Sequence, residues 1–456
     1  MPRCKGVMAL FQPVDDVGLA AVALVGLAGA IGWGIRGSYG HEKGATLPGA
    51  MIALSICFVS ERADWQQASL FIATVAAAGI AFGGCISYAR VAGYARSNGY
   101  ANALYGLACL FLIGGLWGGV GGCALGLVLA RLSPSELLVA AVGVAICQQL
   151  VYYLLVKKAG LRMTPPRSDD WARSLGALLF LAALCFVYGE RAGLVGLSYG
   201  FLGFGFGFVI GMFFQLLGAR TRLRFNWWRL MECTIGFCGG AGLAWGLLPV
   251  SRSPGAELSF SPFWPVLGAY GTLWVIVVFH MGHNFRHYER RGALARYRGN
   301  RSAATLTRQW AVIAGLVLTA VLLAWHFWGP RDPRLATHVS LLGLIWACGI
   351  LCMLLDAFLP QGAPRELTKE WYLGPLILFT LWSFFAPKPF AQPRIPVMGV
   401  AFLWAIALPA TLVLAAVFSR ISSLLWREDP PHAARRFGPG ATHEDFPWVV
   451  KPTKSP

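Results

Sequence analysis

Residues 112–126 read "LIGGLWGGVGGCALG", and they lie inside an apolar stretch from residue 102 to residue 130 that contains no charged side chain. About 20 apolar residues in a helix are enough to cross the hydrocarbon core of a bilayer. Glycine at this density permits close contact between helices in lipid, where association depends on packing. The stretch therefore predicts a membrane-spanning helix that is longer than usual and is either strongly tilted or broken.

The composition of the whole chain agrees with a membrane protein. The 456 residues are 57% hydrophobic and 13% charged, whereas soluble domains carry about 25% charged residues. Segments of about ten alternating residues, which are typical of an outer-membrane barrel, are absent. The predicted fold class is an all-α polytopic membrane protein that is rich in glycine and has about 13 transmembrane helices.

The apolar segments define one transmembrane domain over residues 1–426. Residues 427–456 are rich in proline and charge, and they predict a disordered cytoplasmic tail. The candidate spans lie near residues 17–35, 45–60, 68–87, 102–130, 135–156, 171–189, 193–217, 229–249, 262–283, 308–328, 337–358, 371–386 and 396–424.

A weak internal similarity suggests a parallel repeat of four helices within the first eight spans. The repeat units would be residues 17–130 and 135–249, because each places a glycine-containing helix, a basic loop and an asparagine before a glycine-rich helix. Some transporters are built from such repeats. The alternative explanation is that glycine-rich helices resemble one another without a repeat.

The basic residues predict the orientation of the chain. The formal net charge is +18, and lysine and arginine are concentrated in alternate loops. Basic loops remain on the cytoplasmic side, so we expect an inner-membrane protein with its N-terminus outside and its C-terminus inside. Anionic lipid headgroups explain the positive charge better than nucleic acid does. The basic residues of these loops are Lys157, Lys158, Arg162, Arg167, Arg220, Arg222, Arg224, Arg286, Arg290, Arg291, Arg296, Arg298 and Arg301.

The loop after the first span contains an unusual group of ionisable residues. Residues 34–50 read "GIRGSYGHEKGATLPGA" and include Arg36, His41, Glu42 and Lys43. The glycines predict that the helix loses regularity from residue 32. Irregular backbone within the membrane occurs where it lines a wet cavity, so these residues are candidates for a solute site. An ordinary solvated turn is an equally good interpretation.

Three histidines follow the ninth span. His280, His283 and His287 fall on one helical face, which makes them weak candidates for a metal site. Polar anchoring at the membrane interface is the preferred interpretation. The eleven cysteines form no Cys-x-x-Cys pair, and we predict no cofactor.

Two carboxylates complete the set of candidates. Glu232 opens the eighth span and Asp356 closes the eleventh. Ionisable residues within spans are rare and are commonly functional, although Glu232 follows Arg229 at a spacing that also predicts a local ion pair. With the expected topology these carboxylates fall toward the same membrane face as Arg36 and His280. We therefore expect one polar cavity that opens to the cytoplasm.

These features favour a transporter or permease for a small polar solute, with an anion among the candidates, rather than an enzyme. The alternative is an intramembrane acyl- or glycosyl-type transferase that acts on lipid-linked substrates, and a third interpretation is a non-catalytic scaffold. No ATP-binding loop is present. The candidate binding or coupling residues are Arg36, His41, Glu42, Lys43, Glu232, His280, His283 and Asp356.

Overall fold

The computed structural model describes the greater part of the chain as helix. The described residues are 14–39, 45–83, 88–130, 134–164, 170–221, 223, 225–252, 267–268, 324, 332–358, 368–385, 388–430 and 432–441. They contain thirteen α-helices, of which seven are long and apolar enough to cross a membrane. The chain is therefore a helical, polytopic membrane protein, while the count of thirteen spans stays a prediction.

The elements are, in chain order, β1 (Val14–Gly18), α2 (Leu19–Tyr39), α3 (Thr46–Val59), α4 (Ala63–Gln67), α5 (Ser69–Gly83), α6 (Ala89–Ala95), α7 (Tyr100–Leu129), α8 (Pro134–Tyr152), the π-helix η1 (Tyr153–Lys158), α9 (Trp171–Tyr188), α10 (Arg191–Arg220), α11 (Trp227–Leu247), the 3₁₀-helix η2 (Leu248–Arg252), α15 (Pro333–Phe358), α16 (Thr368–Phe384), β2 (Arg394–Val397) and α17 (Val400–Leu425). A helix lies at eleven of the thirteen expected segments. The expected spans at 262–283 and 308–328 lie outside the described residues, apart from residues 267–268 and 324.

The longest helices, α7 and α10, pack against each other in an antiparallel pair through glycine. A Cβ atom at Gly118 would overlap the carbonyl oxygen of Gly200, and one at Gly122 would overlap that of Gly196. Backbone contact of this kind requires small residues. The expectation that α7 is broken is wrong, because its glycines serve contact with α10 and the helix continues over 30 residues.

Helix α2 packs on α11 in the same way. Cβ atoms at Gly29 and Gly236 would each overlap the other residue's carbonyl oxygen, and Gly32 packs closely on Pro48 of α3. These contacts hold α2 in helical form through Tyr39. The expected loss of regularity from residue 32 is therefore wrong for the described part of this segment, which ends at Tyr39.

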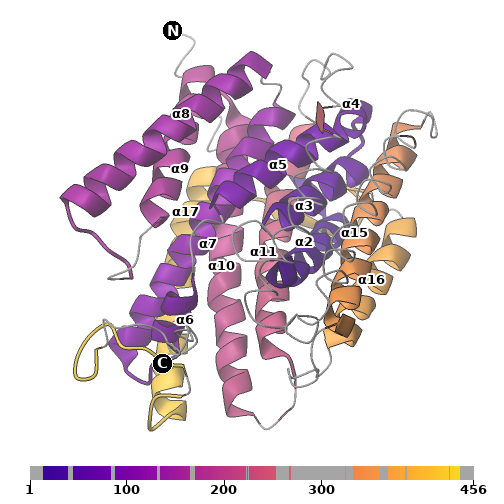
Figure 1. Ribbon diagram of the computed structural model, residues 1–456. Coiled ribbons are helices and arrows are strands. Elements are labelled where there is room, and N and C mark those ends of the chain that lie inside the picture. Colours follow the sequence, from indigo (N-terminus) through magenta and orange to yellow (C-terminus); the bar gives the residue numbers. More distant parts are fainter. Residues whose placement is uncertain are drawn as a thin grey trace, which may run out of the picture.

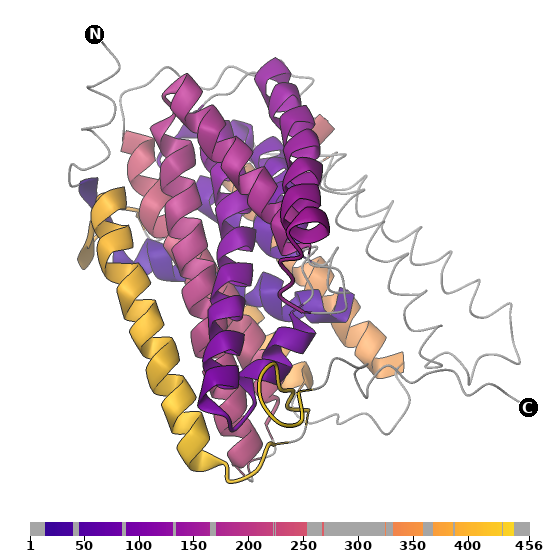
Figure 2. The ribbon, with the colours of Figure 1, turned by 90° about the vertical axis from the view of Figure 1, so that its left-hand side faces the viewer.

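The other helices surround this glycine-rich centre. Figure 1 shows α10 and α11 side by side in the middle of the bundle, with α15 and α16 on one flank and α8 on the other. Helix α17 runs along α7 and α10 on a further side (Figure 2). A two-stranded antiparallel sheet pairs β1 with β2 and so joins the first described residues to the segment before α17.

Helices α5 and α6 lie on either side of the end of the chain's third expected span. Helix α5 ends at Gly83, α6 begins at Ala89, and Tyr88 directly precedes α6. The Tyr88 side chain is 2% exposed and contacts rings from α7, α10 and α11. The end of one helix and the start of the next therefore place a phenol inside the bundle.

Candidate functional site

A buried ion pair joins α2 to α11. Antiparallel packing of the two helices brings Arg36 Nη2 to 3.6 Å from Glu232 Oε1, and the two side chains are 0% and 1% exposed. The other carboxylate oxygen accepts a hydrogen bond from Arg229 Nη1 at 3.1 Å. The structure thus brings together two of the predicted site residues, and it also contains the local Arg229–Glu232 pair.

Aromatic rings enclose the Arg36 guanidinium. Its central carbon lies 4.8 Å from the Trp33 ring centroid and 5.1 Å from that of Trp117, distances typical of cation–π contact. Its Nη2 atom donates a hydrogen bond of 2.9 Å to the Tyr88 hydroxyl. Removing a charge from water is costly unless such partners replace the lost hydration, so the rings and the phenol help to hold this cation inside the bundle.

The ion cluster of Arg36, Arg229 and Glu232 is buried near the ends of two helices, since Arg36 is three residues from the last described residue of α2 and Glu232 is five residues from the start of α11. Gly211 of α10 packs against Met231, the neighbour of Glu232. From Gly211 to the end of α10 at Arg220 is about 14 Å of helix at 1.5 Å per residue. Helix α10 therefore extends beyond the cluster, and the charges are buried although they lie close to the ends of α2 and α11.

A cavity of about 440 Å³ opens at the same end of α10, and we call it the Arg96 pocket. Its walls include Arg96, Gln215, Phe225, Trp227, Trp228 and His432. The Arg96 guanidinium donates hydrogen bonds of 3.3 and 2.9 Å to the Gln215 side-chain oxygen. Within the described part of the chain no carboxylate pairs with Arg96, so its partner in the structure is a neutral amide.

Burial affects the charge of Arg96. Loss of contact with water lowers the pKa of its guanidinium to about 10. Desolvation disfavours the charged form of a base, and an anion in the pocket would reverse this effect. The side chain remains a cation at neutral pH, and it is available to a charge that enters from solvent.

Trp228 forms the wall between the Arg96 pocket and the ion cluster. Its indole N–H donates a hydrogen bond of 3.1 Å to Glu232 Oε1. Its ring stacks on Tyr88 at 6.1 Å between centroids, and the Arg96 guanidinium lies 6.0 Å from the same ring. Trp228 is therefore in contact with both the pocket and the buried charges.

The C-terminal segment, residues 427–441, supplies another wall of the pocket through His432. The Asp429 carboxylate accepts hydrogen bonds from the Ser97 hydroxyl at 3.1 Å and from the Asn98 backbone N–H at 2.8 Å. Burial acts to raise the pKa of Asp429, but the hydrogen bonds from Arg435, Asn98 and Ser97 outweigh it and lower the pKa. The described part of the segment therefore contacts the loop before α7. The disordered tail expected over residues 427–456 stays a prediction.

The remaining predicted residues are not placed by the structure. His41, Glu42 and Lys43 fall at residues 40–44, and His280, His283 and His287 fall at 269–323, both outside the described residues. Asp356 belongs to α15, but its side chain is not described. No group of three metal-ligating side chains occurs among the residues that the structure describes.

Arg96, Tyr88 and Trp228 were not among the residues predicted from the sequence. One local signal was present, because Trp228 and Glu232 are four residues apart and therefore share a helix face. The pairing of Arg96 with Gln215 joins residues that are 119 positions apart, and no local pattern predicts it.

The fold and the site together define a polytopic helical membrane protein with a charged cluster in its interior and a cationic pocket beside it. Comparisons with models of known protein families, with curated proteins and with solved structures found no match for the chain.

Proposed function

We propose that the protein is a transporter or permease for a small anionic solute, which enters through the Arg96 pocket. One observation carries this proposal: a partly desolvated guanidinium lines a cavity, is held by an amide, and is separated from a buried ion cluster by one tryptophan. Transporters place charged and polar groups deep in the bundle beside interrupted helices. The basic loops predict that the pocket faces the cytoplasm.

The chemistry of the pocket suits a small anion. Its volume of about 440 Å³ lies within the range of small-molecule sites, about 300–1,000 Å³. Arg96 offers a planar set of donors that fits a carboxylate or a phosphate. Trp227 and Trp228 offer ring faces to an apolar portion of the solute.

Passage of the solute would depend on exchange of partners at the ion cluster. An anion that passed Trp228 would meet Arg36 and compete with Glu232, whose oxygen lies 3.6 Å from that guanidinium. Glu232 would then keep Arg229 as its one cationic partner, and a buried carboxylate that has lost half of its charge compensation binds a proton more readily. We therefore take Glu232 as the leading candidate for proton coupling.

The geometry gives little support to the enzyme alternative among the described residues. The closest arrangement to a nucleophile and base is His338 with Ser383, whose ring nitrogen and hydroxyl oxygen are 2.9 Å apart. The Ser383 hydroxyl donates its proton to the Thr380 carbonyl oxygen at 2.8 Å. While this bond is formed, His338 can only donate to Ser383, which is the opposite of the activation that a serine nucleophile requires.

Thermal stabilisation of the purified protein by soluble ions would test the proposal. The panel is phosphate, lactate, succinate and glutamate, with choline and mannitol as cationic and neutral comparisons. We expect at least one anion to raise the unfolding temperature and Arg96→Gln to weaken its apparent affinity at least tenfold. Transport of that anion into proteoliposomes should fall in the same variant.

Arg220→Gln is the matched control, because Arg220 is an exposed arginine at the end of α10. It should retain both the stabilisation and the transport. Equal stabilisation of the wild type and of Arg96→Gln would refute the proposed role of the pocket, as would a response to choline alone.

A further inference from the structure

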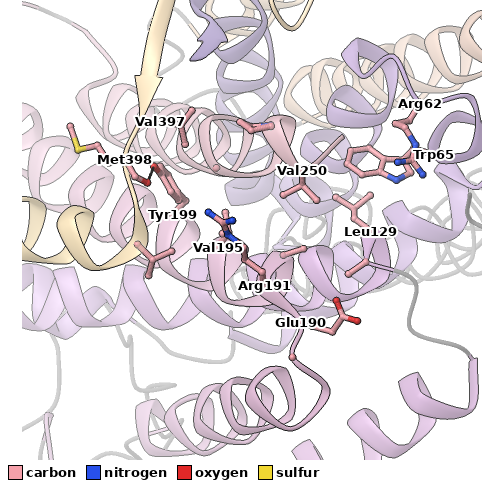
Figure 3. Close-up of a pocket in the computed structure, with 16 residues that line it drawn as sticks. Arg62, Trp65, Leu129, Glu190, Arg191, Val195, Tyr199, Val250, Val397 and Met398 are labelled. Atoms are coloured by element: carbon pink, nitrogen blue, oxygen red, sulfur yellow. Dashed lines mark hydrogen bonds between the residues drawn. The ribbon is translucent and has the colours of Figure 1, made fainter. Parts of the chain in front are cut away.

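A second cavity lies at the opposite end of α10, and we call it the Arg191 pocket (Figure 3). Its volume is about 340 Å³. Valine side chains at positions 195, 250 and 397 form apolar walls. Arg191 and Gln215, which line the two pockets, are separated by about 36 Å of helix at 1.5 Å per residue. The two pockets are therefore separate sites.

Arg191 gives this cavity a positive charge. It is the first residue of α10, and its side chain reaches across the cavity toward Tyr199, whereas Glu190 points away (Figure 3). No hydrogen-bond or ion-pair partner of Arg191 occurs in the described part of the chain. A half-buried guanidinium in this position favours an anion as its partner.

The backbone at the start of α10 adds to the positive potential. Gly189, Glu190 and Ala192 line the cavity beside Arg191. The Glu190 side chain makes no capping hydrogen bond to the helix. The first-turn N–H groups of an uncapped helix and the helix dipole both stabilise negative charge.

Trp65 and Arg62 line the far end of the cavity. Trp65 is 1% exposed, and its indole N–H, which has no acceptor among the described residues, is itself buried. Next to it Arg62 is held by Asp64 through two hydrogen bonds of 2.7 and 2.6 Å. Arg62 is neutralised in this way, whereas no carboxylate among the described residues neutralises Arg191.

We propose that the Arg191 pocket binds a carboxylate or phosphate group that is carried on a small apolar body. The anionic group would lie against Arg191 and the first turn of α10, and the apolar body would pack on Val195 and Val250. A soluble organic acid and an anionic lipid headgroup share this chemistry. The inference depends on this cavity alone and not on the proposed function of the Arg96 pocket.

Binding of six-carbon probes to the full-length protein in neutral detergent tests the inference. The probes are hexanoate, hexanol and hexylammonium at equal concentrations, followed by calorimetry and by the unfolding temperature. We expect hexanoate to bind at least tenfold more tightly than the other two. Arg191→Gln should remove this preference, Arg191→Lys should keep part of it, and Arg220→Gln should keep all of it.

A cavity-filling variant separates shape from charge. Val250→Phe keeps Arg191 and reduces the space for the apolar body, so it should weaken hexanoate binding by several fold. Hexanoate binding that survives Arg191→Gln, or that is lost only in Arg96→Gln, overturns the inference and leaves the proposed function standing. Failure of the Arg96 pocket to bind anions has no effect on these results.

Nanodiscs distinguish the two sources of the anion. Phosphatidylglycerol in place of phosphatidylcholine should weaken the apparent affinity for hexanoate in the wild type if a lipid headgroup occupies the Arg191 pocket. It should leave that affinity unchanged if the ligand is a soluble acid. Competition that persists in Arg191→Gln would place the lipid elsewhere and overturn the inference.

Discussion

Glu232→Gln is the most informative perturbation of the interior. The carboxylate is 1% exposed, accepts hydrogen bonds from Trp228 and Arg229, and forms an ion pair with Arg36. The amide keeps the shape and one acceptor oxygen but removes the negative charge between two guanidinium groups. Breaking a buried pair by removing one partner costs about 3–5 kcal/mol, so we expect a loss of that size in the free energy of unfolding.

Equilibrium unfolding in mixed micelles would measure this loss. Glu61→Gln is the control, because Glu61 is exposed, and it should change the free energy by less than about 0.5 kcal/mol. A double-mutant cycle with Arg36→Gln isolates the pair. We expect a coupling energy of about 1–3 kcal/mol, since the second substitution removes a cation that the first left with a weaker partner.

Two outcomes would contradict the reasoning. A loss below about 1 kcal/mol for Glu232→Gln would mean that the amide replaces the carboxylate in full, and that the charge contributes nothing to the cluster. Additive single substitutions would mean that Arg36 and Glu232 do not interact, despite their separation of 3.6 Å.

Three further predictions concern packing and pH. Gly118→Val should prevent close packing of α7 on α10, because the valine side chain would overlap the carbonyl oxygen of Gly200. The unfolding temperature should therefore fall sharply. Gly374→Ala, at an open position, should leave the unfolding temperature nearly unchanged. Anion binding in the Arg96 pocket should decline as the pH rises through about 10, where Arg96 loses its proton. Calorimetry between about pH 8 and 11, a range that brackets this pKa, would detect the decline. The lowered pKa of Asp429 means that the ionised carboxylate stabilises docking of the C-terminal segment at pH values above its ordinary pKa of 3.8. This contribution is lost as the pH falls through the lower pKa that Asp429 has in the folded protein. The anisotropy of a fluorophore on the segment should drop in that pH range, and Asp429→Asn should abolish the pH dependence.

The positions of the helices could be predicted because they depend on local properties. In lipid each backbone polar group must be satisfied within its own segment, so an apolar stretch of sufficient length already specifies a helix. Predictions from local sequence were wrong where contact with a partner helix stabilises a glycine-rich helix. The prediction of an irregular backbone from residue 32 was wrong because Gly29 and Gly32 pack on α11 and α3.

The candidate site was predictable only in part. Arg36 and Glu232 stood out as charges beside apolar runs, and the structure places them together. The proposed roles of Arg96 and Trp228 were not predicted, because basic loops and interfacial aromatic residues occur in most membrane proteins. The internal repeat and the coupling roles of His41, Glu42 and Asp356 stay predictions.

The sequence by itself determined that this chain is a helical membrane protein, because the free energy of placing each segment in lipid depends on the composition of that segment. The tertiary structure alone decided which charges meet, since Arg36 and Glu232 are 196 positions apart and become neighbours only when α2 and α11 pack through glycine. It also decided where the two pockets lie. A cavity exists only where packed helices leave space between them, and its shape depends on contacts between segments that are distant in the chain.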